Sequence, residues 1–486
     1  MRSISVKQAG KDDNVCELTE GPLTPKGAIM CHPHMDAYIL SIIGLEKQVD
    51  VPSVKQALQS SLVNHRPFCS SIKKGRWGNY LWVHKEVIDI EKHVIVPALD
   101  PQYIQCKEFV EDYTASLACD PPLDPSSPLW QIHILNYRSG EAEASLVFKI
   151  HHCLGDCVSL MSLFLECTRK VTDMNSISTF PNANRKVNSI STNWRSSNFL
   201  QIFCTLMHVV WLTLKDLVNL IATILWMKDS KIFRRGRSIC PKRLAHVTID
   251  LQDIAVVKNA LNCTVNDVVV GMLSAGFVQY IKHPHAEALW KGSNVDKVIS
   301  KLRLRALVAV NMRPLPGLHR LEYMLSNPKQ ARWGNEFGTW LLPIPLEKQE
   351  DPLNYCRITT ANLLKKKASM EASLMFFLLG LVSRFSLVKL AMYLLYRVTL
   401  NTTMVFSNVL GPVEDVQFMG NRVTHIITTV SWLPQPIVIH FQSYARKAKL
   451  VVMAAEDTMP DPLQLCMYCL DALKQMKEAA LRREIQ

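Results

Sequence analysis

The feature that most constrains the fold of this chain is the segment EASLVFKIHHCLGDCVSLMSLF, residues 143–164, in which a strand pattern gives way to a helix pattern. Apolar residues occupy every second position from Leu146 to Ile150, and this period of two predicts a half-buried strand. An aspartate at position 156 suits a helix N-cap. Helical spacing then connects the apolar residues that follow it, Leu160, Met161, Phe164 and Leu165. The two predicted elements meet at a corner that can face a cleft.

Two adjacent histidines, His151 and His152, fall at this corner, with Asp156 four residues after the second. Neutral imidazole is well suited to take a proton near pH 7, so His152 can serve as the general base for an alcohol that attacks an acyl thioester. Such a reaction needs no serine or cysteine nucleophile. The structural alternative is that both histidines simply end the strand and that Asp156 only caps the helix.

The motif HHCLGDC, residues 151–157, resembles the HHxxxDG motif of the coenzyme A dependent acyltransferase superfamily. Its surroundings resemble the plant wax ester synthase/diacylglycerol acyltransferase family over about residues 20 to 480. Further segments agree in family order: PLWQIHIL (128–135), TVNDVVVGML (264–273), RALVAVNMRP (305–314), GNEFGTWLLPIP (334–345) and SNVLGPVEDVQFMGNRV (407–423). The ordered set is more specific than the histidine motif alone, which peptide-synthesis condensation domains share.

This resemblance implies an α/β, two-domain fold like that of chloramphenicol acetyltransferase, with a substrate tunnel between the domains. The implied activity is acyl-CoA:long-chain-alcohol O-acyltransfer, which makes wax esters, with diacylglycerol as a second expected acceptor. It also implies that His152 is the base, that His151 supports it, and that Asp156 is a structural carboxylate. Acyl-CoA is then a co-substrate, and no other cofactor is expected.

Cys157 departs from the family motif, which ends in glycine. Glycine allows backbone angles and close approaches that a side chain forbids, so Cys157 is a candidate substrate-binding residue that narrows the entrance or reduces activity. If the backbone angle φ is negative there, cysteine simply fits. The departure motivates an alternative function, a catalytically impaired, membrane-associated protein that binds acyl-CoA or lipid.

Asn266 is a further candidate catalytic residue, in the segment NCTVNDVVVGMLSAGF. Thr264 and Asp267 have the spacing of a capping box before an apolar helix, so we interpret Asp267 as structural. The family places its asparagine near the catalytic histidine, where a side-chain amide can stabilise an oxyanion or orient the alcohol.

Three weaker substrate-binding candidates come from other segments of the resemblance. Ser407 and Asn408 follow a strand pattern and precede a Gly-Pro turn, in a segment expected to cross between the two halves and line the cleft. Arg313 ends another strand-like run, where it either forms a structural ion pair or meets the phosphates of the coenzyme.

The 486 residues exceed one ordinary core, and the alternation of helix and strand patterns favours α/β layers. We predict an N-terminal acyltransferase domain at 1–170 and a C-terminal one at 246–486. Residues 171–245 between them begin with a polar crossover rich in Ser, Asn and Thr and continue into an apolar and then basic segment.

Residues 198–227 carry only two charges, Lys215 and Asp216, and residues 228–243 carry seven basic side chains against one acidic. This arrangement suits an anionic membrane surface, and peripheral attachment is favoured over a true span because the two charges interrupt the apolar run. The alternative is a pair of core helices with a solvated basic loop. Residues 374–396 are also apolar, and either form a core helix or the rim of an acyl tunnel.

The formal charge of +13 favours a membrane or coenzyme A phosphates, and no nucleic-acid motif accompanies it. The N-terminus lacks the apolar core of a secretory signal. We therefore expect the endoplasmic reticulum membrane, with a cytosol-facing site, or the plasma membrane. The fourteen cysteines are scattered, and neither CHPH (31–34) nor the cysteines beside His151 and His152 have the spacing of a zinc site, so no metal is expected.

Overall fold

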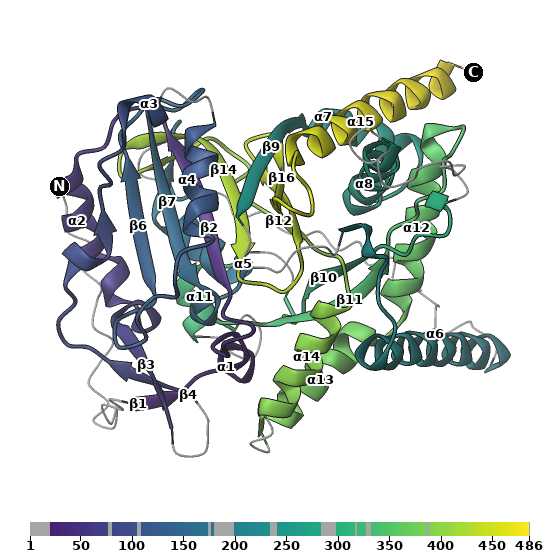
Figure 1. The fold of residues 1–486 in the computed structure, drawn as a ribbon, viewed down its shortest axis with the longest axis horizontal. Coiled ribbons are helices and arrows are strands. Elements are labelled where there is room, and N and C mark those ends of the chain that lie inside the picture. The colour runs from purple at the N-terminus through teal and green to yellow at the C-terminus, as the bar shows by residue number, and fades with distance from the viewer. Residues whose placement is uncertain are drawn as a thin grey trace.

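The computed structural model describes residues 20–75, 80–104, 108–173, 176–178, 199–233, 241–282, 298–315, 318–326, 332–384 and 388–485. The chain forms two α/β halves side by side, with the N-terminal elements in one half and most later elements in the other (Figure 1). Most of the polar crossover predicted after residue 171 lies outside the described residues.

The N-terminal half is built on a seven-stranded sheet with strand order β5-β6-β7-β2-β14-β13-β8. Its strands are β2 (Tyr38–Leu45), β5 (Val94–Ile95), β6 (Trp130–Leu135), β7 (Ala144–His151), β8 (Thr168–Lys170), β13 (Val416–Phe418) and β14 (Asn421–Ser431). Helices of this half are α1 (Pro25–Met30), α2 (Val51–Ser60), α3 (Pro101–Ile104), α4 (Phe109–Leu117) and α5 (Cys157–Glu166). A small sheet of β1 (Glu20–Pro22), β4 (Tyr80–His84) and β3 (Ser70–Lys74) lies at its lower edge in Figure 1.

The predicted corner is confirmed: β7 ends at His151, a 3₁₀ turn covers His152–Leu154, and α5 begins after Asp156. The Asp156 carboxylate accepts from the backbone N–H of Ser159 at 3.0 Å, as an N-cap does. The prediction that β7 is only half-buried is wrong. Val147 is fully buried on the second face, in a cluster with residues of α4, so β7 is a central strand with both faces covered.

The C-terminal half contains a six-stranded sheet with strand order β11-β10-β12-β15-β16-β9. Its strands are β9 (Lys242–Asp250), β10 (Arg305–Asn311), β11 (Phe337–Pro343), β12 (Met404–Val409), β15 (Ile437–Tyr444) and β16 (Lys447–Ala455). Its helices are α6 (Phe199–Leu225), α7 (Leu251–Ala260), α8 (Val265–Lys282), α12 (Pro352–Ala368), α13 (Glu371–Arg384), α14 (Val388–Leu400) and α15 (Pro462–Ile485). The short helix α11 (Leu321–Ser326) packs instead against α5 of the N-terminal half (Figure 1). The largest apolar core of the described residues packs α8, α12 and α15 against this sheet.

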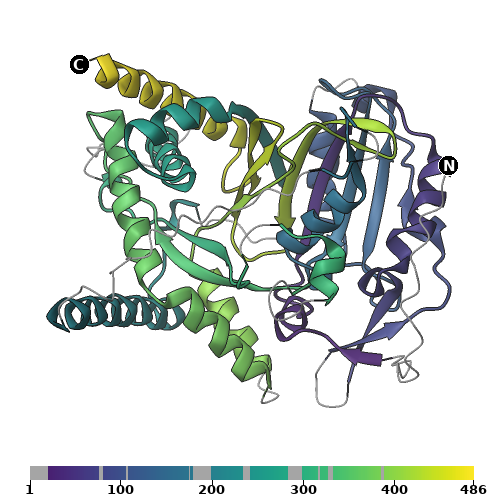
Figure 2. The same cartoon turned by 180° about the vertical axis from the view of Figure 1, so that it is seen from behind.

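The segment at 407–423 crosses between the halves, as the resemblance predicted. Strand β12 pairs with β10 and β15 in the C-terminal sheet, whereas β14 pairs with β2 from Val423 to Ser431 in the N-terminal sheet. Gly411 lies in the crossover, where a Cβ atom would collide with the carbonyl oxygen of Ser443. Figure 2 shows this strand, β14, between the two halves. The division of the chain into domains at 1–170, 171–245 and 246–486 remains a prediction.

Helix α6 projects from one end of the molecule and packs against α14 and α12 (Figure 1). Among the described residues, α6 is the one unbroken helix that is both long enough and apolar enough to cross a membrane. The apolar stretch 374–396 forms parts of two helices, α13 and α14, which pack against each other. Of the predicted basic run, Lys228 and Lys231 follow α6, but Arg243 lies in β9 and pairs with Glu456, and residues 234–240 lie outside the described residues.

Candidate active site

A cavity of about 180 Å³ lies where the two halves meet, and His152 lines it. Strand β12 contributes Ser407 and Asn408, and strand β15 contributes His440. Apolar side chains make up most of the remaining wall, and they come from α1, β10, β11, α13, α14 and β14. The cavity therefore combines a few polar groups with a wall that suits hydrocarbon chains.

The imidazole of His152 is oriented by Asn335, which lies just before β11. The side-chain amide of Asn335 donates from Nδ2 to the backbone oxygen of His152 at 2.8 Å, so its Oδ1 is the atom that faces the ring. This Oδ1 accepts from His152 Nδ1 at 2.8 Å. The proton is thereby placed on Nδ1, and Nε2 keeps the lone pair that a general base requires.

Burial lowers the pKa of His152 below the ordinary histidine value, and this outweighs the hydrogen bonds and the Asp156 charge, which act to raise it. The group is consequently neutral at pH 7. A neutral imidazole at the wall of a cavity, with an Nε2 that no hydrogen bond of the described residues uses, is the arrangement that proton abstraction needs.

His151 lies behind the cavity and is fully buried. Its Nδ1 accepts from the backbone N–H of Cys153 at 3.1 Å, and its Nε2 donates to the Asp36 carboxylate at 2.7 Å. Both ring nitrogens are therefore used by the protein, which fixes the end of β7 and with it the position of His152.

Asp156 and Arg313 form a buried, two-pronged ion pair, with distances of 2.8 Å and 3.0 Å between guanidinium nitrogens and carboxylate oxygens. Arg313 is 3% exposed and also donates to the backbone oxygens of Arg332 and Gly334. Arg313 was expected either to form an ion pair within the protein or to meet the coenzyme phosphates. In the structure it forms the ion pair. The pair ties the HHCLGDC corner to the loop that carries Asn335.

The other predicted site residues separate into two groups. Cys157, Ser407 and Asn408 line the cavity. Asn266 is exposed and does not line it, but its Oδ1 accepts from Asn408 Nδ2 at 2.7 Å. Asp267 forms the predicted capping box, because it accepts from the Thr264 N–H at 2.7 Å.

Cys157 is the first residue of α5 and is absent from the residues with positive φ. A side chain therefore meets no backbone strain at this position, and the motif glycine is not needed for its conformation. Burial raises the pKa of the thiol to about 12, so Cys157 is a neutral thiol and not a nucleophile.

Sequence reasoning missed Lys26 and His440, which line the cavity, and Asn335, which binds the His152 ring without lining the cavity. Lys26 lies over the Phe376 ring, and burial lowers its pKa to about 8. His440 is 1% exposed, and burial lowers its pKa to about 4. The Nζ of Lys26 and the Nδ1 of His440 have no hydrogen-bond partner among the described residues, so the cavity holds polar groups that a substrate can satisfy.

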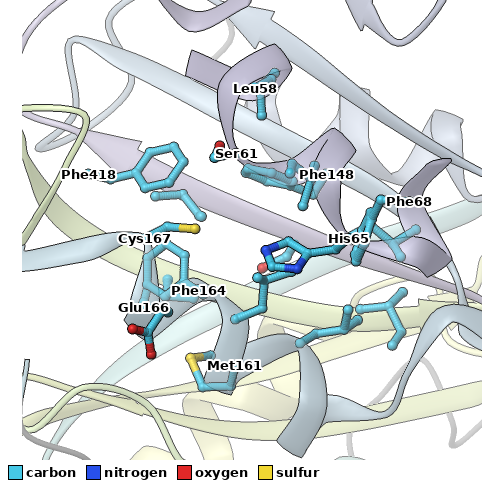
Figure 3. Close-up of a pocket in the computed structure, with 18 of the residues that line it drawn as sticks. Leu58, Ser61, His65, Phe68, Phe148, Met161, Phe164, Glu166, Cys167 and Phe418 are labelled. Carbon is cyan, nitrogen blue, oxygen red and sulfur yellow. The ribbon is translucent and has the colours of Figure 1, made fainter. Parts of the chain in front are cut away.

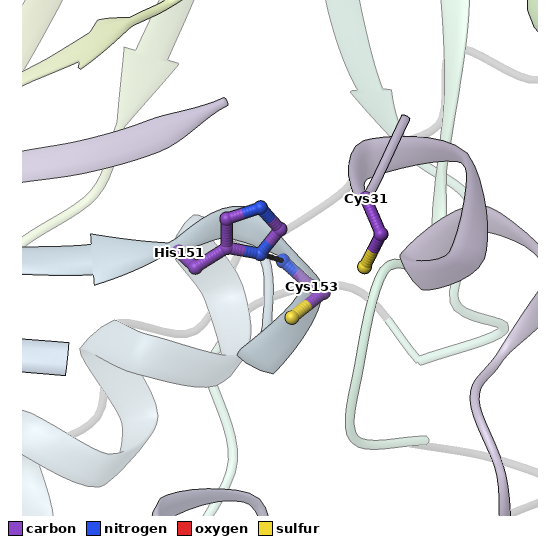
Figure 4. A group of neighbouring side chains, drawn as sticks. All are labelled: Cys31, His151 and Cys153. Atoms are coloured by element: carbon purple, nitrogen blue, oxygen red, sulfur yellow. Dashed lines mark hydrogen bonds between the residues drawn. The ribbon is translucent and has the colours of Figure 1, made fainter. Parts of the chain in front are cut away.

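Cys31, His151 and Cys153 also come together, with their ligand atoms within 4.8 Å of one another (Figure 4). The hydrogen bonds of His151 occupy both of its nitrogens, and burial raises the pKa of Cys153 well above the usual thiol value. A metal needs a free imidazole nitrogen and thiolates, so these residues suit buried packing better than a metal centre.

The two joined halves and the central histidine cavity define the fold of the coenzyme A dependent acyltransferases. A wax ester synthase/diacylglycerol acyltransferase from Marinobacter aquaeolei VT8 has a similar structure, with a TM-score of 0.59 and 16% identity over 95% of this chain and all of that one. A trichothecene 15-O-acetyltransferase from Fusarium sporotrichioides is also similar, with a TM-score of 0.56 and 11% identity over 95% of each chain.

Sequence comparison narrows this class. The profile "Wax ester synthase/diacylglycerol acyltransferase catalytic domain" matches residues 40–269, and "WS/DGAT C-terminal domain" matches residues 333–477. Wax ester synthase/diacylglycerol acyltransferase 5 of Arabidopsis thaliana is 34% identical over 96% of this chain and 95% of its own length, and number 11 is 33% identical over 98% of each. The chain belongs to the wax ester synthase/diacylglycerol acyltransferase family and is an O-acyltransferase.

Proposed function

We propose that this protein transfers a long acyl chain from coenzyme A to the hydroxyl of a long-chain alcohol, and that diacylglycerol is a second acceptor. The observation that carries this proposal is the neutral His152, whose Nδ1 is bound to Asn335 and whose Nε2 is free at the wall of a largely apolar cavity. An apolar wall suits two hydrocarbon substrates, and the base acts on the one hydroxyl between them.

In the proposed reaction, His152 Nε2 removes the proton of the acceptor hydroxyl while the hydroxyl oxygen attacks the thioester carbonyl carbon. The carbonyl oxygen becomes an oxyanion, and the unpartnered groups of Lys26 and His440 are the polar groups of the cavity that can stabilise it. The C–S bond then breaks, and protonated His152 returns the proton to the departing coenzyme A sulfur. Asn266 acts through Asn408, to which it is hydrogen-bonded.

The alternative function, a catalytically impaired lipid-binding homologue, was motivated by Cys157. The ordinary helical start of α5 at this residue removes the backbone reason for impairment. We therefore favour the enzyme. A Cys157→Gly variant separates the two, because a large gain of activity would mean that the cysteine disables the natural protein.

The direct test supplies the purified protein with labelled palmitoyl-CoA and either hexadecanol or diacylglycerol, and separates the lipid products. We expect labelled ester with the alcohol, and the ratio of the two products gives the acceptor preference. Folded protein that forms no ester with either acceptor, beside an active reference enzyme, would contradict the proposal.

We also propose that α6, together with α13 and α14, attaches the protein to a membrane. One face of α6 exposes large apolar side chains at helical spacing, and α13 and α14 expose others; they include Phe203, Trp211, Val218, Phe377 and Tyr393. Soluble monomeric proteins rarely expose an apolar surface of this extent. Lysines at positions 215, 228 and 389 are exposed nearby and suit anionic headgroups.

An in-plane position fits α6 better than a span. Asp216 on its protein-facing side pairs with the buried Lys366 of α12 at 2.7 Å, which holds the helix against the body of the protein. The catalytic cavity also reaches Leu379 of α13 and Leu395 of α14, so a lipid acceptor has a short path from the membrane. Cysteines such as Cys69, Cys356 and Cys466 are buried thiols, which suits the cytosolic face of the endoplasmic reticulum.

Replacing Phe203, Trp211 and Val218 together with Glu should weaken binding to vesicles with anionic lipids at least about 10-fold, because charged groups replace apolar side chains that enter the interface. Co-sedimentation measures this. The control places Glu at Leu463, Met467 and Leu481, apolar residues of α15 that are also exposed, though less than the three on α6. Equal vesicle binding by both triple variants would contradict the proposed membrane face.

A further inference from the structure

A second cavity, of about 440 Å³, lies inside the N-terminal half and does not include His152 (Figure 3). It lies between α5, the seven-stranded sheet and the end of α2 with the turns that follow it, and the sheet contributes residues at alternate positions, among them Ile39, Ser41 and Ile43 of β2. Helix α5 contributes Cys157, Leu160, Met161, Leu163, Phe164 and Glu166, and Cys167 follows just after its end. We call this cavity the α5 chamber.

The walls of the α5 chamber are suited to a hydrocarbon chain. Most of its lining residues are apolar, and it is partly open to solvent beside the exposed residues Ser60, Ser61 and Met419. The hydroxyls of Ser41 and Thr428 on the sheet face lie 3.2 Å apart and hydrogen-bond to each other. The Phe418 ring lies beside the rings of both Phe148 and Phe164. Its charged groups, Glu166 and Arg169, lie at or beyond the last residue of α5.

Cys157 belongs to the walls of both the α5 chamber and the catalytic cavity. Among the described residues, it is the one that lines both. It follows His152 by five residues and begins α5, so the shared wall lies close to the proposed base along the chain. From Cys157 to Cys167 the chamber follows α5 for about 15 Å, given a rise of about 1.5 Å per residue, which suits a long chain.

We propose that the α5 chamber binds the acyl chain of the thioester and that the Cys157 side chain sets the width of its entrance. The inference rests on the proposed acyl transfer. The catalytic cavity also reaches Leu379 and Leu395, on the helices of the proposed membrane face, and this part of its wall suits the lipid acceptor. The acyl chain then extends past Cys157. The cysteine that replaces the motif glycine thus tunes acyl selectivity.

Two matched substitutions test whether the α5 chamber determines the acyl chain lengths that the protein accepts. Cys157→Trp should block the entrance, so that kcat/KM for palmitoyl-CoA falls at least about 10-fold relative to butyryl-CoA. Cys167→Trp, the same change at the far end, should reduce activity with the longest chains and spare intermediate ones. The ratio of hexadecanol to decanol as acceptor should stay unchanged in both variants.

Binding distinguishes failure of this inference from failure of the proposed function. In a His152→Ala background, Cys157→Trp should lower the affinity for hexadecyl-CoA thioether and leave the affinity for butyl-CoA thioether unchanged. This binding result is expected even if the natural protein forms no ester. Cys157→Met replaces the tryptophan variant if that variant does not fold, and Cys157→Gly should keep long-chain binding. An unchanged chain-length dependence, or an altered acceptor preference instead, would overturn the assignment.

Discussion

His152→Gln should lower kcat by about 10²- to 10⁴-fold, the usual contribution of a positioned general base. Glutamine keeps a polar side chain at the cavity wall but cannot accept the hydroxyl proton and return it to the sulfur. Since the backbone oxygen of His152, not its ring, binds the Asn335 amide nitrogen, the loop contact survives the change. The expected result is a protein with an unchanged melting temperature and almost no ester formation.

A histidine outside the cavity supplies the control for this variant. His425 is partly buried on β14, and it lines other hollows that do not contain His152. His425→Gln therefore makes the same chemical change at a comparable depth, and should keep full activity. A folded His152→Gln enzyme with activity near that of His425→Gln would remove His152 from the chemistry.

Arg313→Met should destabilise the protein by about 3–5 kcal/mol, because it leaves the Asp156 carboxylate buried without its positive partner. Activity should fall as well, since this pair joins the corner that carries His152 to the loop that carries Asn335. The free energy of unfolding, measured by urea denaturation, checks the first effect. Adding Asp156→Asn to Arg313→Met should recover part of the loss, because the unpaired charge is then gone.

An exposed ion pair provides the comparison. Arg243 and Glu456 lie 2.7 Å apart with half of each side chain exposed, so Arg243→Met should cost only about 0–1 kcal/mol. Similar losses for Arg313→Met and Arg243→Met would contradict the structural importance of the Asp156 pair.

The corner of the site was predictable because its signals are local. The alternation before His151, the helical spacing after Asp156 and the capping carboxylate all lie within about 20 residues, and the structure confirms each of them. The two-domain fold was predictable from motif segments whose order matches a known family. The burial of both faces of β7 was not, because Ser145, Val147 and Lys149 mix polar and apolar residues on the face that α4 covers.

The partners of His152 could not be found from the sequence, because contacts distant along the chain bring them together. Asn335 lies 183 residues after His152, in a segment that was recognised only as part of the family pattern. Lys26 and His440 carry no local signal beyond a short helix and an alternating strand. Asn266 shows the converse: its segment was recognised, but the structure places Asn408 between it and the cavity.

The pH dependence of kcat/KM tests the central claim, that neutral His152 held by Asn335 is the base. A base acts when it is unprotonated, and burial lowers the His152 pKa, so activity should stay level through pH 7 and fall only below about pH 6.5. Asn335→Asp adds a negative charge beside the ring, raises that pKa, and should move the fall to higher pH. A wild-type fall centred above pH 6.5, or one that Asn335→Asp does not move, would contradict the assignment of His152 as the base.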